Sequence, residues 1–210
     1  MARQMASILD YTFIDSGAMY RAITLFFLRN KVDLKDENAV QSALRAINLR
    51  FQKNRETGNQ EICLNGLPVE MDIRSMAVAE RVSEVAAIKS VRDFAVAQQQ
   101  LLGKDKGVVM DGRDIGTVVF PNAELKIFMT ASIAVRTKRR LIELQAKHPE
   151  ITIEEVAENL QQRDLIDSTR DISPLKQADD AIVLDNTCLT PEEQLNLAME
   201  WARKEIENVN

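Results

Sequence analysis

Short apolar segments alternate along the chain with longer segments in which apolar residues recur every three or four positions. The short apolar runs predict buried strands at 12–14, 107–110, 124–129 and 181–184. The helical spacing predicts helices at 1–9, 18–29, 33–47, 75–102 with a break at 88–90, 132–147, 152–167 and from Pro191 onward. Because short strands alternate with longer helices, the pattern favours an α/β fold with a parallel sheet that helices cover on both faces.

One region interrupts this alternation. Residues 48–53 and 60–64 alternate between apolar and polar positions and flank a polar segment at 54–59. This arrangement predicts a β-hairpin that ends at Gly66 and Pro68. We interpret it as a subdomain inserted into the parallel-sheet domain.

Composition narrows the class of protein. Of the 210 residues, 45% are hydrophobic, which excludes a disordered chain, and 27 Lys and Arg against 32 Asp and Glu give a net charge of −5. This acidic balance argues against a nucleic-acid polymer as partner. Cys63, Cys188 and the single His148 form no zinc-ligand pattern, and no metal ligand is predicted. The longest apolar run, 22–28, is too short to span a bilayer and no secretory signal precedes it, so we expect a cytoplasmic protein with no membrane partner.

Two polar segments follow predicted strands, at the positions where ligands bind in a doubly wound sheet. In the first, 15–21, Ser16 either caps the next helix or contacts a ligand, and Arg21 lies further along that helix. In the second, 111–117, Arg113 and Asp114 lie between two glycines that permit tight turns. The alternative to a ligand site here is a local surface ion pair.

Arginines gather in two further segments. Arg163, Asp167 and Arg170 are spaced i, i+4, i+7, which is typical either of a solvated, salt-bridged helix end or of a mobile flap that delivers arginines to phosphate. A fourth basic group, for which a solvated face is an equally good interpretation, consists of Arg136, Arg139 and Arg140. Since guanidinium groups bind phosphate in bidentate fashion and are interleaved here with hydrogen-bond acceptors, the sequence indicates a nucleotide ligand.

These segments resemble one known family. The runs at 15–21, 71–74, 111–121 and 163–170 read DSGAMYR, MDIR, DGRDIGTVVFP and RDLIDSTR, and they are similar to those of bacterial cytidylate kinases. The similarity extends in order over nearly the whole chain, and the DGRDIGT run is highly specific.

The resemblance implies a P-loop NTPase-like fold, a doubly wound parallel sheet that here lacks its first strand and phosphate loop. It implies a small inserted, β-containing subdomain that binds the nucleoside monophosphate (NMP), three-stranded in the family, and a helical lid. On this basis the core comprises 1–47 and 88–210, the NMP-binding subdomain 48–87, and the lid about 160–172 within the core.

The activity implied by the resemblance is transfer of a phosphoryl group from ATP, with magnesium, to CMP or dCMP. The transfer would be in-line and would depend on positioning and charge neutralisation, in a monomeric enzyme. The resemblance assigns the cytosine amino group to Ser16 and Asp114, the CMP phosphate to Arg21 and Arg113, the sugar to Arg163 and Asp167, and the base or acceptor phosphate to Arg92 and Arg170. Of these, Arg113, Arg163 and Arg170 are the expected catalytic residues.

The sequence departs from the family at its beginning. The family's Gly-rich loop ending Gly-Lys-Ser/Thr would precede the first predicted helix, whereas the first glycine here is Gly17 and the first lysine is Lys31. We expect that the sequence starts at an internal methionine of a longer gene and that a chain without the loop binds ATP poorly, so the ATP-binding residues are unassigned. Two alternatives stay open: a non-catalytic nucleotide-binding or regulatory protein on the same scaffold, and a kinase for another nucleoside monophosphate.

Overall fold

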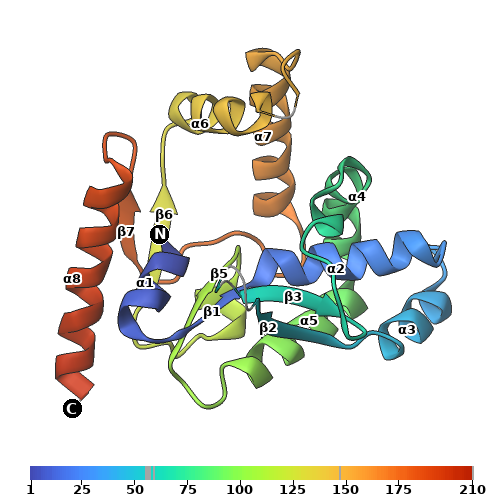
Figure 1. Cartoon of the computed structure of the whole chain (residues 1–210), viewed down its shortest axis with the longest axis horizontal. Coiled ribbons are helices and arrows are strands. Elements are labelled where there is room, and N and C mark those ends of the chain that lie inside the picture. The colour runs from blue at the N-terminus through green and yellow to red at the C-terminus, as the bar shows by residue number, and fades with distance from the viewer. Residues whose placement is uncertain (55–57, 59, 147, 210) are drawn as a thin grey trace.

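The computed structural model describes residues 1–54, 58, 60–146 and 148–209, and in it helices and strands alternate along most of the chain (Figure 1). The helices are α1 Ala2–Leu9, α2 Ser16–Arg29, α3 Glu37–Arg45, α4 Met76–Ala87, α5 Lys89–Leu102, α6 Ile133–Gln145, α7 Ile153–Thr169 and α8 Pro191–Val209. The strands are β1 Thr12–Asp15, β2 Leu49–Lys53, β3 Gln60–Leu64, β4 Leu67–Pro68, β5 Val108–Asp111, β6 Ile127–Thr130 and β7 Ile182–Asp185. Two short helical turns, η1 Asp72–Arg74 and η2 Ile115–Val119, complete the set of elements.

The α/β class is confirmed, because four of the strands form parallel pairs. β1 pairs with β5, from Thr12 opposite Val108 to Asp15 opposite Asp111. β6 pairs with β7, ending with Thr130 opposite Asp185.

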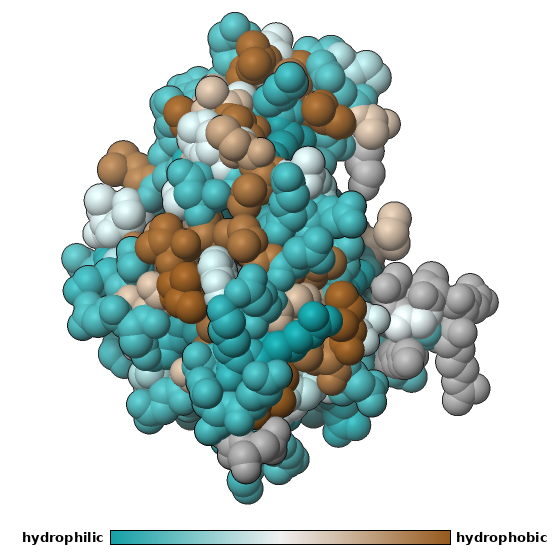
Figure 2. Space-filling view, turned by 90° about the vertical axis from the view of Figure 1, so that its left-hand side faces the viewer, coloured by the Kyte–Doolittle hydropathy of each residue, from teal (hydrophilic) through white to brown (hydrophobic). Residues whose placement is uncertain are grey.

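The expected single sheet is not present among the described residues, where the two pairs form separate two-stranded sheets. β5 and β6 therefore each have a neighbouring strand on one side only. Strands of parallel sheets are normally buried on both faces, yet Ile182 and Val183 of β7 are 38% and 48% exposed. Figure 2, which faces the side of the molecule that lies at the left in Figure 1, shows apolar surface interleaved with hydrophilic surface.

The main core is built around α2. Met19, Ala22 and Ile23 of this helix are fully buried and pack in one cluster with residues of β1, α3, α4 and α5. A second, smaller cluster joins Met5 of α1 to Met199 of α8. The residues that follow β1 and β5 are therefore anchored by the larger of the two cores.

The predicted hairpin is confirmed as β2 and β3, although most of its turn, 54–59, lies outside the described residues. A third antiparallel strand, β4, follows through a turn in which Asn65 and Gly66 both have positive φ, as a tight hairpin turn requires. Gly66 therefore lies in the turn after β3, and the small sheet ends at Pro68, as predicted. Ile62 is fully buried in the main core, so this small sheet shares its core with the parallel-sheet domain.

Helix boundaries follow local signals in the sequence, with one correction. Asp36 caps α3, and Thr152 and Glu155 form the predicted capping box of α7. The predicted break between α4 and α5 falls at Ile88, which is extended. Ser16 is not the cap of α2: Asp15 caps this helix by accepting a hydrogen bond from the backbone N–H of Ala18.

Several other boundaries differ from expectation, and the helix predicted at 33–47 spans only Glu37–Arg45. The strand predicted at 124–129 begins only at Ile127, and η2 was not predicted. The helix predicted to reach Lys147 ends at Gln145, and Lys147 itself lies outside the described residues. Among the described residues, the helices are all too short or too polar to cross a membrane.

Candidate active site

Two carboxylates lie side by side at the carboxyl ends of β1 and β5. Asp15 and Asp111 are register partners, and Asp15 also forms a 3.1 Å ion pair with Arg21 one helical turn into α2. Desolvation and then the charge of Asp15 raise the pKa of Asp111 to about 6, whereas Arg21 opposes the shift. This edge of the sheet thus holds closely spaced negative charge that a cation would stabilise.

Ser16 joins the two strand ends. Its hydroxyl donates a 2.6 Å hydrogen bond to the backbone carbonyl of Asp111. A Cβ atom on Gly112 would lie 2.2 Å from the Ser16 Oγ and 2.8 Å from Ile115 Cδ1, so only glycine fits there. Gly112 and Gly116 do not have positive φ, and Gly112 is therefore required for close approach rather than for a tight turn.

Arg113 and Asp114 do not form the local surface ion pair that was the alternative to a ligand site. Asp114 pairs with Arg92 of α5, and the two side chains are 4% and 2% exposed. Arg92 also donates a 3.1 Å hydrogen bond to the carbonyl of Ala86, near the end of α4. Arg113 points elsewhere, and its Nε lies 2.8 Å from Oδ2 of Asp167.

The carboxyl-terminal part of α7 reaches this cluster. Asp167 contacts Arg113 and, at 3.4 Å, Nη1 of Arg170, whose Nε donates to the carbonyl of Ser173. Desolvation, followed by the charge of Arg113, lowers the pKa of Arg163. Desolvation and then Arg92 lower the pKa of Arg170. The arginines outnumber their carboxylate partners, and such an excess of positive charge is suited to an anionic ligand.

The fourth basic group serves several purposes. Arg136 forms a 2.6 Å ion pair with Asp164 and so ties α6 to α7. Arg139 donates to the side chain and carbonyl of Asn186 and is a structural residue. Arg140 pairs with Glu143 on its own helix and also acts on the Arg163 charge.

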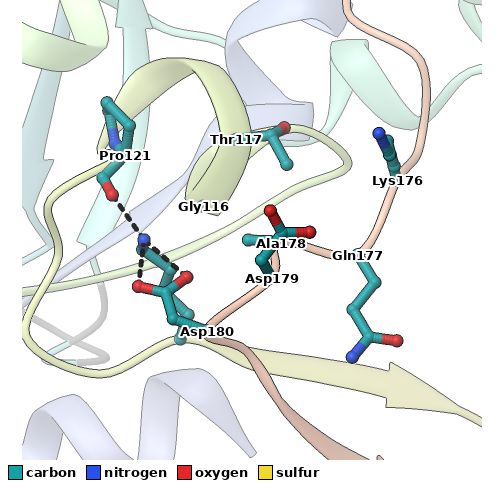
Figure 3. A pocket seen from close by; sticks show the side chains of 9 residues that line it. Gly116, Thr117, Pro121, Lys176, Gln177, Ala178, Asp179 and Asp180 are labelled. Atoms are coloured by element: carbon teal, nitrogen blue, oxygen red, sulfur yellow. Dashed lines mark hydrogen bonds and ion pairs between the residues drawn. The ribbon is translucent and has the colours of Figure 1, made fainter.

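A polar pocket of about 390 Å³ lies beside η2 and contains none of the predicted site residues (Figure 3). Lys126 lines it, and its ammonium group is held by the carboxylate of Asp180 at 2.7 Å and by the carbonyl of Pro121. Among the described residues, we find no group of three or more His, Cys, Asp or Glu side chains arranged to hold a metal ion.

The structure thus brings all eight predicted site residues to the elements around the ends of β1 and β5: Ser16, Arg21, Arg92, Arg113, Asp114, Arg163, Asp167 and Arg170. The polar segments 15–21 and 111–117 contained Asp15, Asp111 and Tyr20, but sequence reasoning assigned none of them a role. The first two could have been recognised as the last residues of adjacent strands. Tyr20, whose ring centroid lies 5.3 Å from the Arg92 guanidinium carbon, carries no sequence signal of its own.

The fold defines a class: α/β proteins with paired parallel strands, in which ligands generally bind beyond the carboxyl ends of the strands. A family model described as cytidylate kinase matches residues 1–204. A cytidylate kinase of Bacteroides thetaiotaomicron is 49% identical over 212 residues, an alignment that spans 100% of this chain and 91% of that protein. Cytidylate kinases of Parabacteroides distasonis and Flavobacterium psychrophilum are 51% and 49% identical, covering 98% and 95% of this chain and 91% and 90% of theirs.

The chain belongs to the cytidylate kinase family. It is therefore a nucleotide-binding transferase of the nucleoside monophosphate kinase class.

Proposed function

We propose that this protein phosphorylates CMP or dCMP with ATP to give CDP or dCDP, and that the acceptor nucleotide binds at the ends of β1 and β5. The observation that carries this proposal is the arginine cluster around Asp167, in which Arg163 has no ion-pair partner among the described residues. The nearby Arg92–Asp114 pair supplies a carboxylate that suits an amino group on the base.

The contacts indicate which part of the nucleotide each charged side chain would bind. Arg21 pairs with Asp15, and both Arg21 and Arg113 act on the charge of Asp111, so the two arginines would bind the acceptor phosphate and share its charge. Asp167 already forms ion pairs with Arg113 and Arg170. On binding, a sugar hydroxyl would contact Asp167 and the phosphate would contact the arginines, in place of some of these ion pairs. Arg113, Arg163 and Arg170 would stabilise charge on the transferring phosphoryl group.

On the base side, Ser16 and Asp114 would accept hydrogen bonds from the cytosine amino group, while Arg92 and Arg170 would contact the base or the acceptor phosphate. Asp114 lies almost entirely out of solvent against Arg92. The base would therefore meet a carboxylate whose position is already set by an ion pair, which favours selective recognition over adaptable binding.

Magnesium would accompany ATP, and the carboxylates present fit it. Oxygen ligands from Asp side chains are those that Mg²⁺ prefers, and Asp15 and Asp111 stand opposite each other at the ends of paired strands. The ion supplies charge neutralisation on the phosphates. Asp15 and Asp111 would hold it with its water ligands, while the residues that bind the ATP phosphates are not assigned.

The domain division is part of the same proposal. Residues 48–87 would form the NMP-binding subdomain, supported by the small β2–β3–β4 sheet. Residues 160–172 would form the lid within a core of 1–47 and 88–210, supported by the position of Asp167 and Arg170 at the end of α7.

Nucleotide binding tests the proposal directly. Titration calorimetry of the 210-residue chain should show tighter binding of CMP than of UMP, because UMP presents a carbonyl where CMP presents an amino donor to Asp114. Arg113→Met should weaken CMP binding about tenfold or more, the order expected for a charge-assisted contact to phosphate. Arg81→Met is the matched control, since Arg81 is equally exposed and, within the part of the chain that the structure describes, pairs only with Glu84 on α4.

Equal affinity for CMP and UMP would contradict the base assignment and favour a kinase for another nucleoside monophosphate. An equal effect of Arg81→Met and Arg113→Met would contradict the phosphate site. A coupled assay of ADP release, with CMP and ATP, tests phosphoryl transfer separately from acceptor binding. CMP binding without ADP release would favour the non-catalytic alternative for the chain as assayed.

A further inference from the structure

Arg92 is held on three sides by groups of different chemistry. Its Nη2 pairs with Asp114, its Nη1 donates to the Ala86 carbonyl at 3.1 Å, and its guanidinium carbon lies 5.3 Å from the centroid of the Tyr20 ring. Such a cation–π contact is strengthened when both groups are removed from water. Arg92 is 2% exposed and Tyr20 is 8% exposed, so this condition is met.

The Tyr20 hydroxyl contributes little to this arrangement. The hydroxyl is buried and makes no hydrogen bond of normal geometry with the described residues, and both amide atoms of the nearby Gln99 are in the same situation. Desolvation raises the pKa of Tyr20 to about 12, while Arg92 and an interaction with Gln99 lower it. A hydroxyl that stays protonated and weakly bonded neither carries charge nor fixes the ring, so the aromatic face is the part that acts on Arg92.

Arg92 and Gln99 are seven residues apart on α5, about two turns, and therefore lie on the same face of the helix toward α2. Tyr20 projects from α2 into this face. The Arg92 guanidinium of α5 thus contacts both the Tyr20 ring of α2 and the carboxylate of Asp114, which lies between β5 and η2.

We infer that Tyr20 is a positioning residue for the acceptor base: its ring holds Arg92 in the orientation in which Arg92 pairs with Asp114. This inference rests on the proposed function, because it assigns Asp114 to the amino group of CMP. Loss of the ring frees the guanidinium to move, and the Asp114 carboxylate then loses its set position. The consequence falls on discrimination between CMP and UMP, since the phosphate contacts of Arg21 and Arg113 do not involve Tyr20.

Two substitutions separate the ring from the hydroxyl. Tyr20→Phe keeps the aromatic face, and we expect the dissociation constant for CMP to change less than about threefold. Tyr20→Leu removes that face, and we expect the ratio of CMP to UMP affinity to fall about tenfold, the order that a desolvated cation–π contact supports. Titration calorimetry with CMP and with UMP measures both.

Phe27→Leu is the matched control, because it makes an aromatic-to-aliphatic change in the same helix at a residue that is 3% exposed and makes no cation–π contact with Arg92. It should lower the thermal midpoint yet leave the CMP to UMP ratio unchanged. If Tyr20→Leu does not fold, Tyr20→Met replaces it, since this flexible side chain fills the space without an aromatic face.

The outcomes are distinguishable from failure of the proposed function. A wild-type chain that binds CMP no better than UMP contradicts the base assignment itself. A wild-type preference for CMP that survives both Tyr20→Leu and Tyr20→Met overturns the role of Tyr20. Loss of that preference in Tyr20→Phe also overturns it, because the hydroxyl would then be the acting group.

Discussion

The two parallel strand pairs share one backbone arrangement but differ at their ends. β1 and β5 finish in Asp15 and Asp111, two facing carboxylates, whereas β6 and β7 finish in Thr130 and Asp185, a hydroxyl facing a carboxylate. Beyond the first pair lie the buried Arg92–Asp114 pair and the arginines of α7. Beyond the second, Asp185 is satisfied locally, accepting hydrogen bonds from the side chain and backbone of Thr187.

Burial explains much of this difference. The main core, centred on α2, lies against β1 and the side of β5, and can hold a charged pair out of solvent. β7 has two apolar residues that are more than one-third exposed, and the charged pair near its start, Lys126–Asp180, has a carboxylate that is 64% exposed. Parallel strand ends alone therefore do not make a site, because the packed helices must also desolvate and orient the charged side chains.

The largest expected effect comes from breaking the buried pair. Asp114→Ala leaves Arg92 charged, desolvated and without its carboxylate, and should lower the free energy of unfolding by about 3–5 kcal/mol. Asp180→Ala makes the same change at the second strand pair, where Lys126 is also buried but the lost carboxylate is 64% exposed, so that water can take its place. Its effect should be clearly smaller. Urea denaturation measures both, and equal losses would show that burial does not separate the two regions.

A medium effect is expected at the glycines that follow β5. Gly112→Ala places a methyl group 2.2 Å from the Ser16 Oγ, so the Ser16–Asp111 hydrogen bond must break or the turn must shift. Overpacking of this kind costs about 1–3 kcal/mol, and CMP binding should weaken as well. Gly116→Ala meets only the flexible side chain of Lys126, at 3.2 Å, and should change stability by less than about 1 kcal/mol. Thermal unfolding of the two variants would contradict this account if Gly116→Ala were the more damaging.

Much of the fold could be predicted from sequence, because its signals are local. Apolar periodicity located helices α1 to α8, though not the turns η1 and η2, and most of the strands. The Thr152–Glu155 capping box needs only two residues three positions apart. Predictions failed where a partner lies far along the chain. Ser16 has the chemistry of a helix cap, but Asp111, distant in sequence, takes its hydroxyl and leaves the cap to Asp15.

The candidate site shows the same limit. The family resemblance identified Arg92 and Asp114 as site residues. Their positions in the sequence do not predict that the two side chains are buried against each other, or that the Tyr20 ring contacts the guanidinium. The sequence also did not predict that the parallel strands form two separate sheets, because apolar periodicity predicts where strands lie but not which strands pair. Partner choice is decided by tertiary packing, and only the structure shows it.

The smallest effect concerns pH and compares the two strand-end carboxylates. Desolvation and Asp15 raise the pKa of Asp111 to about 6, so the folded state binds more protons than the unfolded state between about pH 4 and 6. The stability that this proton contributes is complete below about pH 4 and is lost as the pH rises through about 6. Since Asp111 keeps access to solvent, we expect a contribution below about 1 kcal/mol.

Asp185 has the opposite sign, because hydrogen bonds from Thr187 lower its pKa. Its contribution is present above the unfolded pKa and is lost as the pH falls through the lower folded value. Asp111→Asn should therefore flatten the loss of stability between pH 4 and 6, whereas Asp185→Asn should flatten the loss at more acidic pH. Urea denaturation across pH 3–7 measures both slopes. If both variants changed the slope of unfolding free energy against pH in the same way, the ends of β5 and β7 would be electrostatically alike, contrary to their difference in burial.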